Sequence, residues 1–428
     1  MRRLYTLLFY LATPLVWLRL LWRARQQTAY LHHLSERYAF YPKRSPKKGG
    51  PPAPLIWLHA VSVGETRAAE PLIAALLMAY PEHRILLTHM TPTGRATGGE
   101  LLRKHSERLL QAYLPYDLPD ACGRFFRHFR PCLGLLMETE LWPNLIDQAK
   151  RCRIPLALIN GRLSARSARG YQRFAPLIRP ALASLSRVAA QTPADAERLR
   201  QLGAGRLVVC GNLKFDVTPA VEKIQRGLHW KEALGARPVL LAASTREGEE
   251  VLILEALAEI KIAGLLLLLV PRHPQRFDAV AALVKARGLS LCRRSAEILP
   301  TEAAQVWLGD SMGEMVAYYA AADLALLGGS LLPFGGQNLI EAAACGCPLL
   351  IGPHTFNFAQ AAADAVACGA ARRVENVDVA ARAAHELLNN RADLRAMRDA
   401  ALTFSQMHRG ATKRTLALIE ELLPRSRP

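Results

Sequence analysis

Short apolar segments recur along most of the chain and alternate with longer amphipathic stretches, among them residues 68–80 and 247–260. Continuous apolar runs of four to seven residues are typical of parallel strands that are buried on both faces, and the stretches between them suit crossover helices. The apolar runs cover residues 55–61, 85–90, 133–137, 155–160, 239–243, 265–270, 306–309, 324–329 and 348–352. The pattern predicts an α/β fold with doubly wound parallel sheets.

A polar stretch, residues 212–237, divides these runs into two sets. Because 428 residues exceed what one compact core usually holds, two domains are expected. We predict two Rossmann-like domains that face a cleft, an N-terminal one over 52–215 and a C-terminal one over 216–428 that includes the terminal helix. A Lys-, Pro- and Gly-rich linker, KRSPKKGGPPAP, separates the first domain from an N-terminal segment, residues 1–48.

The N-terminal segment carries an apolar run of fifteen uncharged residues, Leu4 to Leu18, which Arg19 interrupts. A spanning helix needs about 20 apolar residues, so this run reaches that length only if Arg19 extends toward the headgroups. Trp17 and Trp22 are aromatic residues of the kind that lie near membrane boundaries. We expect a membrane anchor, spanning or interfacial, on the cytoplasmic side of the cell inner membrane. A signal peptide would need a small-x-small cleavage site, which does not follow, and a buried core helix is the remaining alternative.

The charge of the chain is concentrated near its start. The composition, 51% hydrophobic and 21% charged, excludes a disordered chain, and the formal net charge is +19. Ten basic residues and one acidic residue, Glu36, precede residue 49, so this segment supplies +9 of the total. A basic balance indicates a membrane surface or a nucleic acid as partner, and the asymmetry favours an anionic membrane surface. The eight cysteines form no CxxC pair and no zinc spacing, and are expected to be reduced core thiols.

In open α/β sheets, ligands bind beyond the carboxyl ends of the strands, and polar residues follow the apolar runs of the first half. Glu65 lies in Ser62-Val63-Gly64-Glu65-Thr66, where it is either a first-turn carboxylate that stabilises the helix dipole or a general base. Glu138 and Glu140 directly follow the run 133–137, and a carboxylate there is costly unless it is paired or functional. Lys214 lies at the proposed interdomain junction, although most such lysines are simply exposed.

The second half carries a Gly-rich loop, Gly335-Gly336-Gln337-Asn338, which opens a helix. Its free backbone N–H groups suit a phosphate, although the same sequence also makes an ordinary turn. Glu341 falls on the same helix face as Asn338 and could hold a pair of ribose hydroxyls. Arg272 is placed within Pro271-Arg272-His273-Pro274, where the prolines restrict the backbone. The chain has no P-loop, GxGxxG, DxD or HExxH motif, and His59, His89 and His273 are expected to be structural, so no metal and no cofactor are predicted.

Ten of these strings, taken in order, resemble the 3-deoxy-D-manno-octulosonic acid (Kdo) transferases, and the resemblance spans essentially the whole chain. The longest are METELWPN, residues 137–144, and NGRLSARS, residues 160–167. The others are SVGE, TPTG, GNLKFD, STREGEE, PRHP, GDSMGE, GGQN followed by LIE, and GPHTFNF. The family pattern differs at Gln337, where GGHN is usual, and at Gly161, where NARLS is usual.

The resemblance implies a GT-B glycosyltransferase that moves Kdo from CMP-Kdo to a lipid A precursor (lipid IVA) with inversion, without a metal and without a nucleic-acid partner. Carried onto this chain, it makes Glu65 the general base and assigns transition-state stabilisation to Glu138 and Lys214. It assigns CMP binding to Pro271, Arg272, Met312, Gly313, Glu314, Asn338, Leu339, Ile340 and Glu341. Two alternatives remain from the sequence: a GT-B glycolipid transferase that uses another nucleotide sugar, and a non-catalytic basic module tethered to a membrane.

Overall fold

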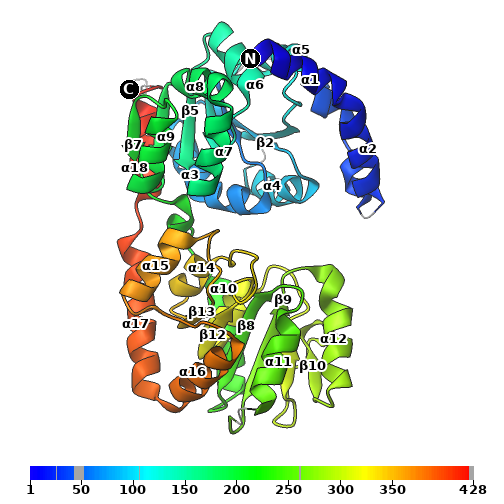
Figure 1. Ribbon diagram of the computed structural model, residues 1–428, viewed down its shortest axis with the longest axis vertical. Helices are drawn as coiled ribbons and strands as arrows, with labels where there is room; N and C mark the ends of the chain where they lie inside the picture. Colours follow the sequence, from blue (N-terminus) through cyan, green and yellow to red (C-terminus); the bar gives the residue numbers. More distant parts are fainter. Residues whose placement is uncertain (26, 43–52, 106, 260–261, 424–428) are drawn as a thin grey trace. The chain divides into compact units, whose positions relative to one another are not determined.

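The structure is a computed structural model that describes residues 1–25, 27–42, 53–105, 107–259 and 262–423. The chain divides into two compact units, Met1–Val217 together with Arg409–Pro428, and Thr218–His408 (Figure 1). Most of the predicted linker, residues 43–52, lies outside the described residues. Each unit is built around its own parallel sheet, as the alternation of apolar and amphipathic segments predicts.

The first unit contains a seven-stranded parallel sheet in the order β3-β2-β1-β4-β5-β6-β7. Its strands are β1 Leu55–His59, β2 Arg84–His89, β3 Leu109–Tyr113, β4 Leu133–Met137, β5 Leu156–Gly161, β6 Arg187–Ala190 and β7 Leu207–Val209. Its helices are α3 Val63–Ala79, α4 Pro92–Lys104, α5 Pro119–Phe129, α6 Pro143–Arg151, α7 Ala165–Arg173, α8 Ala175–Ala183, α9 Pro193–Gln201, the 3₁₀ turn η3 Leu213–Asp216, and α18 Ala411–Glu420. Because both faces of the sheet are covered, β1, β4 and β5 are buried along their whole length.

The second unit repeats this architecture with a seven-stranded parallel sheet in the order β10-β11-β9-β8-β12-β13-β14. Its strands are β8 Val239–Thr245, β9 Leu266–Pro271, β10 Leu291–Arg293, β11 Val306–Leu308, β12 Leu324–Leu327, β13 Leu349–Ile351 and β14 Ala371–Arg373. Its helices are α10 Val221–Ala233, α11 Glu249–Glu259, α12 Phe277–Ala286, α13 Met315–Ala321, α14 Leu339–Ala344, α15 Ala359–Ala367, α16 Val377–Asn389 and α17 Arg391–Met407, with the 3₁₀ turns η4 Pro274–Arg276 and η5 Arg294–Ala296.

The C-terminal helix belongs to the first unit, whereas the sequence places it in the second domain. Leu418 and Ile419 of α18 are buried in the core that α3 forms against the first sheet. Tyr80 donates a hydrogen bond to the carbonyl of Leu423 at 2.7 Å, and Asp216 accepts one from the backbone N–H of Gly410 at 2.6 Å. Along the sequence, the second unit is therefore preceded and followed by segments of the first.

The N-terminal segment forms two short helices, α1 Arg2–Leu11 and α2 Thr13–Ala24, followed by the 3₁₀ turns η1 Thr28–Leu31 and η2 Leu34–Tyr38. The two helices meet at a 50° bend near Pro14 (Figure 1). Among the described residues, no single helix is long and apolar enough to cross a membrane, and this bent pair reaches the necessary length and composition only when taken together.

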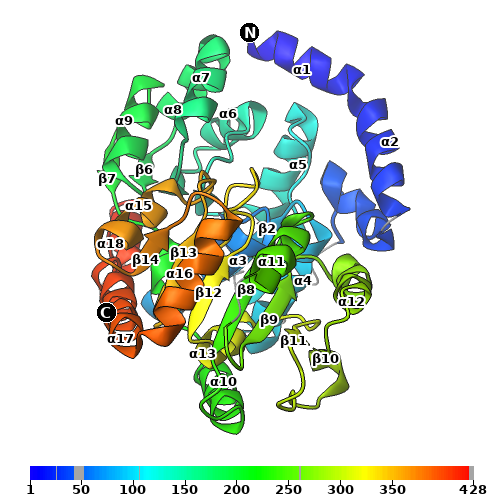
Figure 2. The ribbon, with the colours of Figure 1, turned by 60° about the horizontal axis from the view of Figure 1, so that its bottom comes forward.

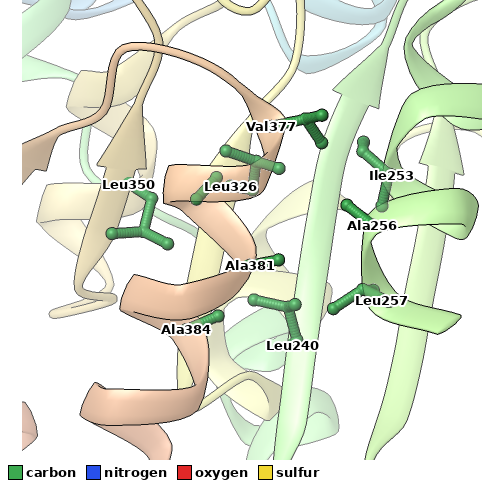
Figure 3. A pocket seen from close by; sticks show the side chains of 10 residues that line it. Leu240, Ile253, Ala256, Leu257, Leu326, Leu350, Val377, Ala381 and Ala384 are labelled. Carbon is green, nitrogen blue, oxygen red and sulfur yellow. The ribbon is translucent and has the colours of Figure 1, made fainter. Parts of the chain in front are cut away.

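Helices α11 and α16 lie side by side on the second sheet (Figure 2), and a small cavity lies between them and the sheet (Figure 3). Leu240, Leu326 and Leu350 line it from the strands, and Ile253 and Ala381 are among its lining residues on the two helices. Every lining side chain is apolar, so the cavity offers no side-chain hydrogen bond to a nucleotide or a sugar. It is a packing defect of the core.

Candidate active site

Glu65 lies in the first turn of α3, directly after β1, and its carboxylate is held by the loop that joins them. The backbone N–H of Val61 donates to Glu65 Oε2 at 2.8 Å, and Ser62 Oγ donates to Oε1 at 3.1 Å. Ser62 is also the N-cap of α3, because its hydroxyl accepts from the backbone N–H of Glu65. The side chain is 9% exposed, so the cap fixes a buried carboxylate at the carboxyl edge of the sheet.

Burial is the main influence on the acidity of Glu65. It raises the pKa of the carboxyl, the nearby negative charge of Glu138 raises it further, and the donors Val61 and Ser62 oppose the rise only in part. The result is a pKa of about 8. A carboxyl with a pKa close to neutral pH is partly ionised there, and its ionised fraction is a stronger base than the carboxylate of a surface glutamate.

Glu138 and Lys214 form an ion pair at the same edge of the sheet. Lys214 Nζ lies 3.0 Å from Glu138 Oε1, and both side chains are mostly buried. Glu138 follows β4 with a φ of 56°, a left-handed conformation that is uncommon for glutamate. Glu138 is therefore paired, as a carboxylate at the end of a buried strand requires, and its partner is a lysine that is itself a predicted site residue.

Two asparagines that the sequence did not single out position Lys214. Asn160, at the end of β5, accepts from the backbone N–H of Leu213 at 3.0 Å, and Asn212 caps η3 by accepting from the N–H of Lys214 at 3.0 Å. Asn160 is buried and has a φ of 52°, which asparagine tolerates better than most residues. The signal available in the sequence was its position at the start of NGRLSARS and at the end of the apolar run 155–160.

Glu140 is a third carboxylate in this region. Trp142 Nε1 donates to its Oε2 at 2.7 Å, and burial, together with the charge of Glu138, raises its pKa. The site therefore gathers three carboxylates with Lys214, and this excess of negative charge favours the protonated state of Glu65.

His59 and His89 are buried within β1 and β2 and face the core. Burial lowers the pKa of His89 to about 4 and that of His59 to about 3, so both are neutral. His89 Nδ1 lies 2.9 Å from the carbonyl of Ala60, and its Nε2 lies 3.1 Å from Gln111 Nε2. The prediction that these two histidines are structural is confirmed.

In the second unit, the predicted CMP-binding residues lie at the carboxyl ends of β9, β11 and β12. Pro271 is the last residue of β9, and the backbone N–H of the exposed Arg272 donates to the carbonyl of Thr245 at the end of β8. Met312 is 64% exposed, and Gly313 turns the chain with a φ of 80°.

Glu314 is directed toward the protein. It accepts from Arg226 at 2.8 Å and from Arg294 at 3.1 Å. Burial alone would raise the pKa of Glu314, but Ser311 and these two guanidinium groups outweigh it and lower the pKa. Because its carboxylate is already paired, Glu314 holds the turn at Gly313 in shape.

The loop 335–338 turns sharply before α14. Gly335 and Gly336 have φ values of 91° and 76°, and Asn338 caps the helix by accepting from the N–H of Ile340 at 3.2 Å. Leu339 and Ile340 are buried, so they offer a ligand only backbone groups, while Glu341 is partly exposed. A residue that the sequence did not single out, Asn357, fastens this loop through its Nδ2, which donates to the carbonyl of Phe334 at 3.0 Å.

The predicted catalytic residues thus lie together in the first unit, and the predicted CMP-binding residues share the carboxyl edge of the second sheet. Within the described part of the chain, no group of three or more His, Cys, Asp or Glu residues is arranged to hold a metal ion.

Comparison with known proteins places both units in glycosyltransferase families. Residues 32–217 match the 3-deoxy-D-manno-octulosonic-acid transferase (kdotransferase) family, and residues 242–403 match glycosyl transferases group 1. The chain is 46% identical to 3-deoxy-D-manno-octulosonic acid transferase of Bordetella pertussis and 37% identical to that of Haemophilus influenzae, and each match covers 99% of both chains.

Several of the solved structures that match cover most of this chain. A glycosyltransferase of Rickettsia africae matches with a TM-score of 0.60 at 13% identity, over 87% of this chain and 99% of that one. Anabaena Alr3699/HepE, in complex with UDP and glucose, matches with a TM-score of 0.59 at 15% identity, over 86% and 99% of the two chains. At this identity the likeness shows only the GT-B-like fold. The whole-length sequence matches go further: the chain belongs to the Kdo transferase family, the glycosyltransferases that act in lipopolysaccharide biosynthesis.

Proposed function

We propose that this enzyme moves Kdo from CMP-Kdo to a lipid A precursor, lipid IVA, with inversion at the anomeric carbon. The donor and the acceptor are those implied by the motif resemblance. The observation that carries the proposal is the buried Glu65 carboxylate, whose pKa is about 8 and which lies beside the Glu138–Lys214 ion pair. An inverting transfer needs one base and a means of offsetting charge, and these three side chains supply both.

In the proposed reaction, Glu65 accepts the proton of the acceptor hydroxyl while the hydroxyl oxygen attacks the anomeric carbon of Kdo. The bond between that carbon and the phosphate oxygen breaks, and CMP leaves with the electron pair. The proton stays on Glu65, whose raised pKa favours that state. Lys214 offsets negative charge that develops during the transfer, and Glu138 fixes the position of its ammonium group.

The second unit is proposed to hold CMP through the carboxyl edge of its sheet. Arg272 is exposed and placed to meet a phosphate, and the turns at Gly313 and Gly335–Gly336 present backbone groups at the same edge. Glu341, in the first turn of α14, is proposed to accept hydrogen bonds from ribose hydroxyls.

The N-terminal helices are proposed to lie in the membrane interface on the cytoplasmic side. The polar side of α1 is tied to the first unit: Tyr5 donates to Asp117 at 3.0 Å, Tyr10 donates to Asp120 at 2.6 Å, and Arg2 pairs with Asp147. The opposite side exposes the apolar residues Leu4, Leu7, Leu8, Leu11, Leu15, Leu18, Leu21 and Trp22. This exposed face suits acyl chains, and the exposed Arg3, Arg19 and Arg25 suit anionic headgroups. No residue of α1 is buried, which argues against the core-helix alternative.

The test is to incubate detergent-solubilised protein with CMP-Kdo and a tetra-acylated lipid A precursor, and to look for Kdo-bearing lipid by mass spectrometry. CMP is expected to inhibit the transfer competitively, and UDP at the same concentration is not. Absence of product, or inhibition by UDP in place of CMP, would contradict the proposal and would favour a GT-B transferase for another nucleotide sugar.

A further inference from the structure

Arg246 directly follows β8, and among the residues that the structure describes its guanidinium group has no carboxylate partner. Its Cζ lies 4.7 Å from the centre of the Phe334 ring, and its Nη1 lies 3.0 Å from His273 Nε2. No carboxylate in the described ranges forms an ion pair with it, although Arg276 nearby binds Glu250 through two hydrogen bonds of 2.6 and 2.8 Å. Arg246 is therefore oriented by an aromatic ring and an imidazole, neither of which neutralises its charge.

The backbone around Arg246 is fixed by Glu249, whose side chain is completely buried. Its carboxylate accepts from the backbone N–H of Arg246 at 2.8 Å, of Gly329 at 2.6 Å and of Leu331 at 3.1 Å. One buried side chain thus joins the loop after β8 to the loop after β12, so Arg246 is presented by a rigid edge.

Gly329 lies between the side chains of Gln337 and Arg246. Its φ is 67°, and a Cβ there would lie 3.0 Å from Gln337 Nε2 and 3.4 Å from Arg246 Cγ. Any larger residue at this position would be strained and would push the neighbouring side chains aside. The Gln337 amide and the aliphatic part of the Arg246 side chain therefore lie next to each other beside Gly329, and both side chains carry nitrogen donors.

The local charge favours an anion beside these two side chains. Partial burial and the positive charges of Arg246, Arg272 and Arg276 lower the pKa of His273, so its imidazole adds no charge of its own. The proposed donor carries two anionic groups, the phosphate that joins CMP to the sugar and the carboxylate of the acid sugar. Arg272 lies on the neighbouring strand end, among the residues assigned to CMP, which leaves the second anion without an assigned partner.

We propose that Arg246 binds the carboxylate of the sugar being transferred, with the Gln337 amide as a second donor. The inference rests on the proposed function and deepens it, because it names the residue that distinguishes an acid sugar from a neutral one. The planar fork of a guanidinium group matches both oxygens of a carboxylate, and its orientation by Phe334 and His273 reduces the entropy lost on binding.

The test compares how each variant handles two ligands that differ by the sugar. The Kd for CMP is measured by calorimetry, and kcat/KM is measured with CMP-Kdo as the donor. For Arg246→Ala, kcat/KM is expected to fall about tenfold to a hundredfold, as for the loss of a charge-assisted hydrogen bond, while the Kd for CMP stays within about twofold of wild type. Arg246→Lys, which keeps the charge and loses the fork, is expected to recover part of the loss. Arg382→Ala, an exposed arginine on α16, serves as the matched control and is expected to behave as wild type.

An equal loss for CMP and CMP-Kdo would overturn the inference, because Arg246 would then contact the phosphate. An unchanged kcat/KM in both Arg246 variants would overturn it as well. If Arg246→Ala fails to fold, Arg246→Lys decides the question by the same comparison. A failure of the proposed function can be distinguished from a failure of this inference, because in the first case the wild-type protein itself would form no Kdo-bearing product.

Discussion

Lys214 Nζ and Glu138 Oε1 lie 3.0 Å apart, and this pair joins two segments that are 76 residues apart in the sequence. The pair lies close to Glu65, and the negative charge of Glu138 is one cause of the raised pKa of Glu65. A single ion pair therefore influences both the position of a cation in the site and the strength of its base.

Glu138→Gln is expected to shift the pH dependence of the transfer. Removing the charge of Glu138 lowers the pKa of Glu65 from its value of about 8, so the rising limb of kcat/KM against pH moves to lower pH, whatever happens to the maximal rate. Steady-state rates between pH 6 and 9 measure this. Glu70→Gln, on the exposed side of α3, the helix that carries Glu65, is the control and is expected to leave the rising limb at the same pH. An unmoved limb, or one that moves to higher pH, would refute the coupling.

Glu65 also predicts how stability changes with pH. In the unfolded chain this carboxyl releases its proton near its ordinary pKa of 4.5, whereas the folded protein keeps it up to about pH 8. The folded state therefore binds the additional proton, and Glu65 lowers the free energy of unfolding as pH rises from about 4.5 to about 8. Glu65→Gln removes this loss, which is at most about 5 kcal/mol. Urea unfolding at pH 5.5 and 8.5 measures this: the free energy of unfolding of the variant, relative to that of wild type, is expected to be higher at pH 8.5 than at pH 5.5. A difference between the two proteins that does not depend on pH would contradict the burial of a protonatable group.

Two adjacent glycines of α4 provide a matched test of packing in the first unit. A Cβ on Gly98 would lie 2.4 Å from His89 Nε2 and 2.6 Å from Gln111 Nε2, side chains that hydrogen-bond to each other, whereas a Cβ on Gly99 would meet no atom within 4 Å. Gly98→Ala is expected to destabilise the protein by about 1–3 kcal/mol, and Gly99→Ala to stabilise it by about 0.5–1 kcal/mol. Chemical unfolding of both variants measures the difference. Equal effects would show that α4 does not pack on His89 as described.

The exposed apolar face of α1 and α2 predicts membrane binding that can be removed without loss of the fold. Leu8 and Leu15 are 56% and 66% exposed, and replacing both with Glu is expected to weaken binding to vesicles of anionic phospholipid at least about tenfold. Co-sedimentation measures this. Val221→Glu combined with Leu228→Glu changes two exposed apolar residues of α10 and is the control. Equal binding of both double variants and wild type would refute an interfacial role for the N-terminal helices.

Much of the fold could be predicted from the sequence, because the nine apolar runs correspond to β1, β2, β4, β5, β8, β9, β11, β12 and β13. The strands that were not predicted are short or lie at the sheet edges. β3, β7, β10 and β14 are the outermost strands, and three of them have only three residues, while β6, the fifth strand that was not predicted, lies inside the sheet and has only four residues. An edge strand is partly solvated, so it lacks the continuous apolar run that marks a central strand. The packing of α18 on the first unit was likewise not predictable, since its local pattern does not specify a partner.

The candidate site was predictable only where a charged residue directly follows a strand. Glu138 meets that condition, and Glu65 lies in the first turn of the helix that follows β1, whereas the contact between Glu138 and Lys214 depends on how β5 and η3 pack. Asn160 and Glu249 are buried polar residues that act by binding backbone N–H groups of other loops. Such long-range contacts leave no periodic signal in the sequence.

The most direct test of the central claim compares wild type with Glu65→Gln in the transfer of Kdo from CMP-Kdo to the lipid A precursor. Since general-base catalysis typically contributes about 10²–10⁴-fold, the variant is expected to lose at least a hundredfold in kcat while its Kd for CMP is unchanged. Product is measured by mass spectrometry and CMP binding by calorimetry on the same preparation. A Glu65→Gln enzyme that forms Kdo-bearing lipid at the wild-type rate would contradict the assignment of Glu65 as the base.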